Sequence, residues 1–203
     1  MAARLCWENI EVGCDALSPG NPVCVANGLF AGTPVPVGGK WGLASKSPLT
    51  GFIGDSLSGS WFAIALKRAG WDGIVVHGAS DTWVDVLVDD DRVEFCDATD
   101  LLGLGTFETE EAIREQLGDD QVRSATIGPA GENGVLYSAI MHDVNRAAGR
   151  NGLGALMGSK NLKAVAVRGT LKVPVADRKP VTATAKWLGN NYKELAAWAA
   201  EGI

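Results

Sequence analysis

Two glycine-rich segments, each placed before an apolar helical pattern, are the parts of this sequence best suited to bind an anion. They cover residues 58–67 and 149–157. A glycine loop that opens a helix offers free backbone N–H groups and the positive end of the helix dipole. Both segments lead into a short apolar strand that ends in a glycine, Gly78 or Gly169. The pair indicates an internal duplication with two related phosphate sites. The alternative is that both loops serve only tight helix–strand packing.

Cationic side chains lie close to the second of these segments. Arg146 and Arg150 are four residues apart, which at a helix start would let them clamp a phosphate through bidentate hydrogen bonds. The alternative for them is a solvated surface pair. Lys40 follows a Gly-Gly pair and is a further cationic candidate. Lys160 and Lys163 come after the second helix, and we expect them on the surface.

The other ionisable residues that stand out are predicted to have structural roles. Asp55 lies among small residues and is expected to cap a turn. Glu132 is expected to order its loop. His142 and Asp143 are adjacent, so acid–base chemistry is possible, but a structural hydrogen bond is the favoured interpretation. No spacing indicates a Ser-His-Asp or Cys-His arrangement.

Composition excludes several classes of protein. The 203 residues fit one domain of ordinary size, 46% of them are hydrophobic, and the net charge is −6. No long basic run suggests nucleic acid or a membrane surface as a partner. Four cysteines and two histidines show no metal-ligand spacing, which argues against zinc or iron–sulfur ligands in this chain. With no signal peptide or membrane span, the sequence predicts a cytoplasmic protein with reduced cysteines.

Hydrophobic periodicity predicts strands and helices in alternation. Helices are expected at 59–69, 108–117 and 183–200, with a linker at 173–177. Strands are expected at 22–29, 41–46, 73–77, 82–88, 92–96, 124–127 and 134–141, with a turn at 128–133.

This order favours an α+β fold of two mixed β-sheets with flanking helices, related by a pseudo-two-fold axis. The alternative is a Rossmann sheet, against which no strand is followed by Gly-x-Gly-x-x-Gly and an acidic residue about 20 positions on. We expect a domain over 1–172, with 173–203 forming a linker and the start of a helical domain.

Several motifs, in order, carry a family resemblance. They are Lys-Ser-Pro-Leu-Thr-Gly at 46–51, Leu-Lys-Arg-Ala-Gly-Trp-Asp-Gly at 66–73, Ile-Gly-Pro-Ala-Gly-Glu-Asn at 127–133, Arg-Ala-Ala-Gly-Arg at 146–150 and Met-Gly-Ser-Lys-Asn-Leu-Lys-Ala at 157–164. Together they resemble the N-terminal domain of the aldehyde:ferredoxin oxidoreductase family of tungsten enzymes, over about residues 5–180. The resemblance implies a base for a bis-molybdopterin cofactor that carries tungsten or molybdenum.

The resemblance also implies which residues face the cofactor. The residues expected at the two pterin phosphates are Arg146, Ala147, Gly149 and Arg150 in one half-site, with Gly59 and Lys40 in the other. A magnesium ion bridging the phosphates would take the backbone carbonyls of Leu57 and Ala147. Leu57 replaces a family asparagine, and a backbone carbonyl can still act as a ligand after this change of side chain. Lys40 replaces an arginine, so the charge survives but the bidentate fork does not.

A complete enzyme of this kind would oxidise an aldehyde to a carboxylic acid and pass electrons through a [4Fe–4S] cluster to ferredoxin. The cluster ligands are expected beyond residue 203, and the chain is expected to be truncated at both ends. The expected partner is a C-terminal subunit, which would carry the missing part, or a second copy of this chain in a homodimer. Two alternatives stay open: a non-catalytic fragment or partner subunit that keeps the fold without the cofactor, and a generic nucleotide-binding α/β enzyme. No residue is assigned as a catalytic acid or base.

Overall fold

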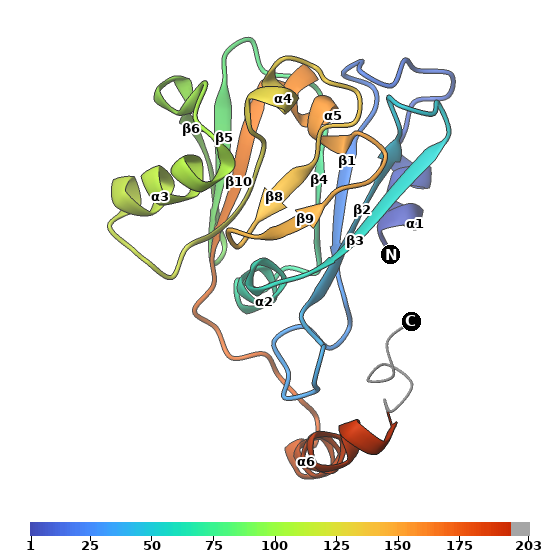
Figure 1. The fold of residues 1–203 in the computed structure, drawn as a ribbon, viewed down its shortest axis with the longest axis vertical. Coiled ribbons are helices and arrows are strands. Elements are labelled where there is room, and N and C mark those ends of the chain that lie inside the picture. Colours follow the sequence, from blue (N-terminus) through green and yellow to red (C-terminus); the bar gives the residue numbers. More distant parts are fainter. Residues whose placement is uncertain (196–203) are drawn as a thin grey trace.

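Two β-sheets meet along their edges and organise the chain (Figure 1). The structure is a computed structural model, and it describes residues 1–195. Sheet A has the strand order β3-β2-β1-β4, and every neighbouring pair in it is antiparallel. Its strands are β1 Val23–Asn27, β2 Lys40–Lys46, β3 Ile53–Gly59 and β4 Gly73–Val76.

Sheet B is larger and mixed. Its order is β6-β5-β10-β7-β8-β9, in which β5 and β10 are parallel and the other pairs are antiparallel. Its strands are β5 Val84–Asp89, β6 Arg92–Asp97, β7 Arg123–Thr126, β8 Ile140–His142, β9 Arg146–Ala148 and β10 Leu162–Arg168. Two sheets with flanking helices are therefore confirmed, and the Rossmann alternative is wrong, because parallel pairing is confined to one pair of strands.

Helices cover both sheets, except for the last one, which stands away from the body of the fold (Figure 1). They are α1 Ala2–Asn9, α2 Trp61–Arg68, the 3-10 turn η1 Thr99–Leu101, α3 Thr106–Leu117, α4 Pro129–Glu132, α5 Leu153–Ser159 and α6 Arg178–Leu195. Among the residues that the structure describes, no helix is both long and apolar enough to cross a membrane.

The predicted helix–strand units both form, but in different settings. Helix α2 leads into β4, an edge strand of sheet A, whereas α5 leads into β10, a central strand of sheet B. The internal duplication therefore stays a prediction. The predicted helix 183–200 begins earlier, at Arg178, and its residues after 195 lie outside the described part of the chain.

Some elements differ from the prediction in ways that affect the site. Strand β3 was not predicted, because its sequence Ile-Gly-Asp-Ser-Leu-Ser-Gly is poor in β-formers and only pairing with β2 makes it a strand. Helix α1 and strand β9 were also missed. The predicted strand 134–141 contracts to β8, and the predicted turn 128–133 contains the short helix α4.

One core joins the two sheets. Trp41 of β2 packs against Phe62 of α2 with ring centroids 4.7 Å apart, and both side chains are buried. The same cluster includes residues of both sheets and of α5, namely Val23, Val25, Leu43, Leu66, Val86, Val88, Ile127, Ile140, Leu156 and Val167. Helix α2 therefore lies within the core between the sheets and fixes their relative position.

Asp85 is a buried carboxylate in β5 that should make stability depend on pH. Burial raises its pKa from 3.8 to about 6, and the charge of Asp97 adds to the rise. A raised folded-state pKa favours folding below pH 3.8, and this contribution is lost as pH rises through about 6. The ionised carboxylate then costs up to about 3 kcal/mol.

We therefore expect Asp85→Asn to raise the free energy of unfolding at pH 8 by up to about 3 kcal/mol. At pH 4 the same substitution should change little. Urea unfolding across this pH range measures the difference. Asp89→Asn, at the exposed end of the same strand, is the matched control. An equal gain from both substitutions at pH 8 would assign the effect to net charge instead of burial.

Candidate cofactor site

The predicted cofactor residues gather where the two sheets meet. Strand β3 is the edge of sheet A and β9 is the edge of sheet B, and the two lie next to each other (Figure 1). Gly59 ends β3 and pairs with Lys40, the first residue of β2. Because edge strands present backbone groups that no further strand pairs, this junction leaves carbonyl and amide groups for a ligand.

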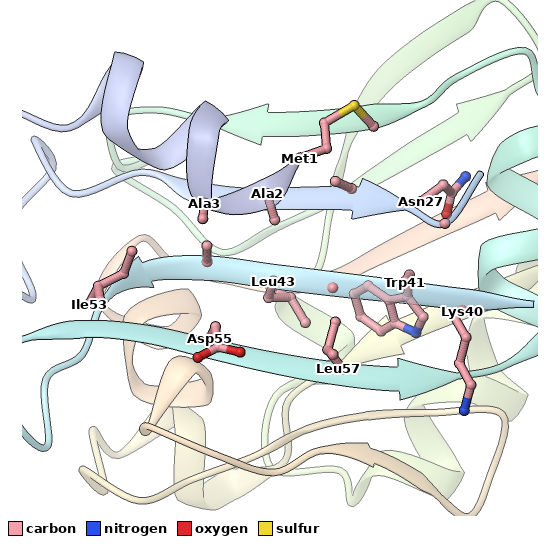
Figure 2. Close-up of a pocket in the computed structure, with 14 residues that line it drawn as sticks. Met1, Ala2, Ala3, Asn27, Lys40, Trp41, Leu43, Ile53, Asp55 and Leu57 are labelled. Carbon is pink, nitrogen blue, oxygen red and sulfur yellow. The ribbon is translucent and has the colours of Figure 1, made fainter.

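Three adjoining clefts follow the junction and contain all seven predicted residues. The sheet A cleft, about 390 Å³, has Lys40 at one end, Leu57 near its middle, and Met1, Ala2 and Ala3 on the opposite side (Figure 2). The α2 cleft, about 410 Å³, is lined by Lys40, Gly59 and Arg146. The β3–β9 cleft, about 730 Å³, is lined by Leu57, Ala147, Gly149 and Arg150, together with Asp55, Ser56 and Asn151.

The cations at these clefts form no salt bridge within the described part of the chain, although Asp143 lines the α2 cleft and Asp55 the β3–β9 cleft. Lys40, Arg146 and Arg150 are exposed, and within residues 1–195 none of them forms a salt bridge. The two arginines lie on different clefts, with Lys40 beside Arg146. An anion placed at the junction would therefore meet cations from both sheets.

Two glycines leave room at the junction. A Cβ on Gly149 would contact only the Cβ of Ala147, at 3.7 Å, so this glycine is not required by packing within the chain. A Cβ on Gly59 would lie 2.9 Å from the ammonium of Lys40. The lysine side chain therefore crosses Gly59, and the missing side chain lets it lie there. Both positions suit close approach of a ligand to the backbone.

Backbone amides at the helix starts take part in hydrogen bonds within the chain, which differs from the prediction. The first N–H groups of α2, on Trp61 and Phe62, donate to Asp143 Oδ2 at 2.6 and 3.4 Å, and Ser60 Oγ accepts from Ala63 N. In α5, Gly154 N donates to the carbonyl of Ser138. The expectation of free amides is therefore wrong for α2. In α5 the bonded amides are those of Gly154 and Ala155, so free amides over residues 149–153 stay a prediction.

The arginines are also placed differently. Arg146 is the first residue of β9, and Arg150 lies in the loop before α5, so the pair does not open a helix. Two glycines of α5 are nevertheless required by close packing. A Cβ on Gly158 would lie 2.0 Å from the carbonyl oxygen of Gly131, and one on Gly154 would lie 2.7 Å from that of Ala139.

The two lysines expected on the surface are buried. Lys160 donates to the carbonyls of Pro19 and Gly78, and burial lowers its pKa. Lys163 forms a salt bridge with Glu132. The surface expectation is wrong because each ammonium finds acceptors on distant segments. Glu132 also accepts from Gly103 N at 3.0 Å, so its side chain bonds to distant segments and not within its own loop, where its role was predicted.

Of the remaining predictions about polar residues, those for His142 and Asp143 are confirmed and the one for Asp55 is wrong. His142 and Asp143 make structural hydrogen bonds, as predicted: His142 Nε2 lies 2.8 Å from Ser58 Oγ, and Asp143 caps α2. Asp55 does not cap a turn, since it is an exposed residue in the middle of β3 that lines the β3–β9 cleft. Its carbonyl accepts from the side chain of Asn151 at 2.7 Å.

Asn151 was missed as a site residue. It joins the loop that carries Arg150 to β3 through this bond, and its own carbonyl accepts from Ser47 Oγ at 2.8 Å. Asn151 and Gly152 both have positive φ, 66° and 69°. The Asn-Gly dipeptide is the sequence signal for such a conformation and could have indicated a constrained loop here.

All four cysteines are free thiols. Among the described residues, no group of three or more His, Cys, Asp and Glu side chains could hold a metal ion. Backbone carbonyls are a different class of ligand, and Leu57 and Ala147, the two residues predicted to supply them, both line the β3–β9 cleft.

A family model described as the N-terminal domain of aldehyde ferredoxin oxidoreductase matches residues 1–169. The chain belongs to the aldehyde ferredoxin oxidoreductase family. Tungsten-containing aldehyde ferredoxin oxidoreductases of Pyrococcus furiosus and Thermococcus kodakarensis are each 46% identical over 179 residues, 88% of this chain and 30% of theirs. The resemblance inferred from the motifs is thereby confirmed.

Two other proteins also match most of this chain. The WOR-like subunit of an aliphatic sulfonate oxidoreductase of Pyrococcus furiosus is 33% identical and aligns with 83% of the chain. A solved structure, the active site complex BamBC of benzoyl coenzyme A reductase with 1,5-dienoyl-CoA, matches with a TM-score of 0.91 and 35% identity. That match covers 95% of this chain and 29% of the other. The chain thus spans about 30% of the length of the curated relatives it matches.

Proposed function

We propose that the chain is the pterin-binding N-terminal domain of a cytoplasmic tungsten oxidoreductase that converts aldehydes to carboxylic acids with ferredoxin as electron acceptor. The observation that carries the proposal is the junction of β3 and β9. All seven predicted residues line its clefts, and its three cations form no salt bridge among the described residues. The proposed chemistry is that named for the tungsten-containing aldehyde ferredoxin oxidoreductases that the chain resembles.

The residues present fit a cofactor with two phosphates. Arg146 and Arg150 would each hold a phosphate oxygen through charge-assisted hydrogen bonds, and Lys40 would add a third cation. Gly149 leaves the space that a phosphate or a pterin edge would fill. The carbonyls of Leu57 and Ala147, on facing edge strands, are suitable ligands for a magnesium ion between the phosphates.

When bound, the tungsten or molybdenum bis-molybdopterin would supply the oxygen transfer and the two-electron chemistry. The residues of this chain bind and orient it. The rigid edge strands fix where the phosphates lie, and α2 in the core fixes the sheets that carry those strands. The [4Fe–4S] cluster and the residues around the substrate are assigned to a part of the enzyme outside these 203 residues, in a partner subunit or a longer chain.

The test is the tungsten, molybdenum and pterin content of the protein purified anaerobically from its host with any tightly bound partner. We expect two pterins per metal atom, since the junction offers two half-sites. Protein without metal and pterin, alone or in its complex, would contradict the proposal and favour a fragment or subunit that keeps only the fold. Binding of a dinucleotide in place of a pterin would favour a nucleotide-binding enzyme.

A further inference from the structure

His142 is a buried histidine that the proposed cofactor contacts do not use, and it lies at the joint between the sheets. Its side chain is fully buried, and its Nε2 is 2.8 Å from Ser58 Oγ. Ser58 lies in β3 between Leu57 and Gly59, while His142 of β8 pairs in register with Arg146 of β9. One hydrogen bond thus connects the strand of one half-site to the strand pair of the other.

The contacts of His142 extend into sheet A. Trp41, the β2 residue opposite Ser58 in register, packs edge-on against the imidazole with centroids 5.0 Å apart. His142 of sheet B therefore inserts against a cross-strand pair of sheet A. The neighbouring Asp143 continues the connection, because its carboxylate accepts from two N–H groups at the start of α2.

The turn that follows is held in an unfavourable backbone conformation. Asp143 and Val144 have positive φ angles of 46° and 67°. Residues other than glycine rarely adopt such backbone conformations, and β-branched residues adopt them least often. Besides the contact of Asp143 with α2, Val144 N donates to Glu110 Oε2 of α3 at 2.9 Å. Such a conformation persists only where surrounding contacts hold it. The turn is followed by Arg146, which lines the α2 cleft.

We propose that His142 is a positioning residue that, through Ser58, sets the separation between the two anion half-sites. This inference rests on the proposed function. Without the His142–Ser58 bond, the side-chain hydrogen bond that remains between β3 and this part of sheet B, among the described residues, comes from Asn151 in the loop after β9. A ligand with two phosphate groups would then have to order the joint on binding, whereas a ligand that uses one half-site would not.

The probes are magnesium pyrophosphate, which can reach cations of both half-sites, and inorganic phosphate, which can use one. In the full 203-residue chain, Ser58→Ala and His142→Asn should weaken pyrophosphate binding at least tenfold in calorimetry and change phosphate binding less than twofold. His142→Gln, whose amide can take the place of Nε2, should retain pyrophosphate affinity within threefold. Ser124→Ala, which removes a buried hydroxyl of β7 without a hydrogen-bond partner among residues 1–195, is the matched control.

Amide hydrogen exchange supplies a readout that needs no ligand. Ser58→Ala and His142→Asn should speed exchange at least tenfold in β3 and β9 but leave β6, the far edge of sheet B, unchanged. Unaltered exchange in β3 and β9, or equal losses for the two ligands, would overturn the positioning role. If the parent chain binds neither ligand, the proposed function fails at this site, and the exchange data still decide whether His142 holds the junction.

Discussion

Replacing Glu132 by alanine is expected to lower the free energy of unfolding by about 4 kcal/mol. Its carboxylate is paired with the ammonium of Lys163, whose side chain is fully buried, while the Glu132 side chain is 11% exposed. Lys163 has one other partner among the described residues, the carbonyl of Leu104 at 3.0 Å. Without the carboxylate, a charged group would remain buried with a single acceptor, and its desolvation would no longer be compensated.

Urea unfolding of the single and double variants measures this effect. Glu132→Ala combined with Lys163→Met should recover much of the loss, because replacing both members of a buried pair by apolar groups is often close to neutral. Glu94→Ala is the matched control, since Glu94 pairs with Arg92 at an exposed position and its removal should matter much less. Equal losses from Glu132→Ala and Glu94→Ala would show that burial of the pair does not determine its contribution.

The same ion pair shows what the sequence could not predict. Lys163 follows a helix and precedes an apolar run, and lysine is usually exposed, so a surface position was expected. Its acceptors lie 31 and 59 residues away in the chain. Burial of a lysine depends on such partners, and spacing within one segment gives no sign of them.

Elements were predictable where a local pattern agrees with the final environment. Strands β1 and β5 are rich in valine, and their β-branched residues match burial within a sheet. Strands β3 and β9 lack that signal: β3 is built of small and polar residues, and β9 is Arg-Ala-Ala. Both are edge strands whose conformation comes from their neighbours, and they carry the site. The fold class was therefore predictable from pattern, while the strands that shape the junction were not.

The candidate site was predictable through its residues but not through its local geometry. The motifs identified Lys40, Gly59, Arg146 and Arg150, and the structure brings them to adjoining clefts. The reasoning from helix starts was wrong for α2, because Asp143 occupies its first amides from 82 residues away along the chain. A glycine before a helix shows only that amides could be free, and whether they are depends on the tertiary structure.

Arg146→Ala combined with Arg150→Ala is expected to weaken the binding of magnesium pyrophosphate about 100-fold. Hydrogen bonds to charged groups contribute about 1.5–3 kcal/mol each, and the lower value applies here because both side chains are exposed. Their removal should also abolish retention of metal and pterin in protein isolated from the host. Isothermal calorimetry and metal analysis measure the two effects, and the unfolding free energy should hardly change, since neither side chain contributes to the core.

Arg4→Ala combined with Arg92→Ala makes the same change in net charge at residues that line none of the three clefts and that pair with neighbouring glutamates. If this control weakened pyrophosphate binding as strongly, the effect would come from the overall charge of −6 and not from the junction. Arg146→Lys with Arg150→Lys separates charge from geometry. Lysine keeps the charge but lacks the planar fork, so we expect it to restore only part of the affinity if the arginines hold phosphate through paired hydrogen bonds. Full restoration would mean that the clefts attract the anion by charge alone, and Lys40 would then be an adequate replacement for the family arginine.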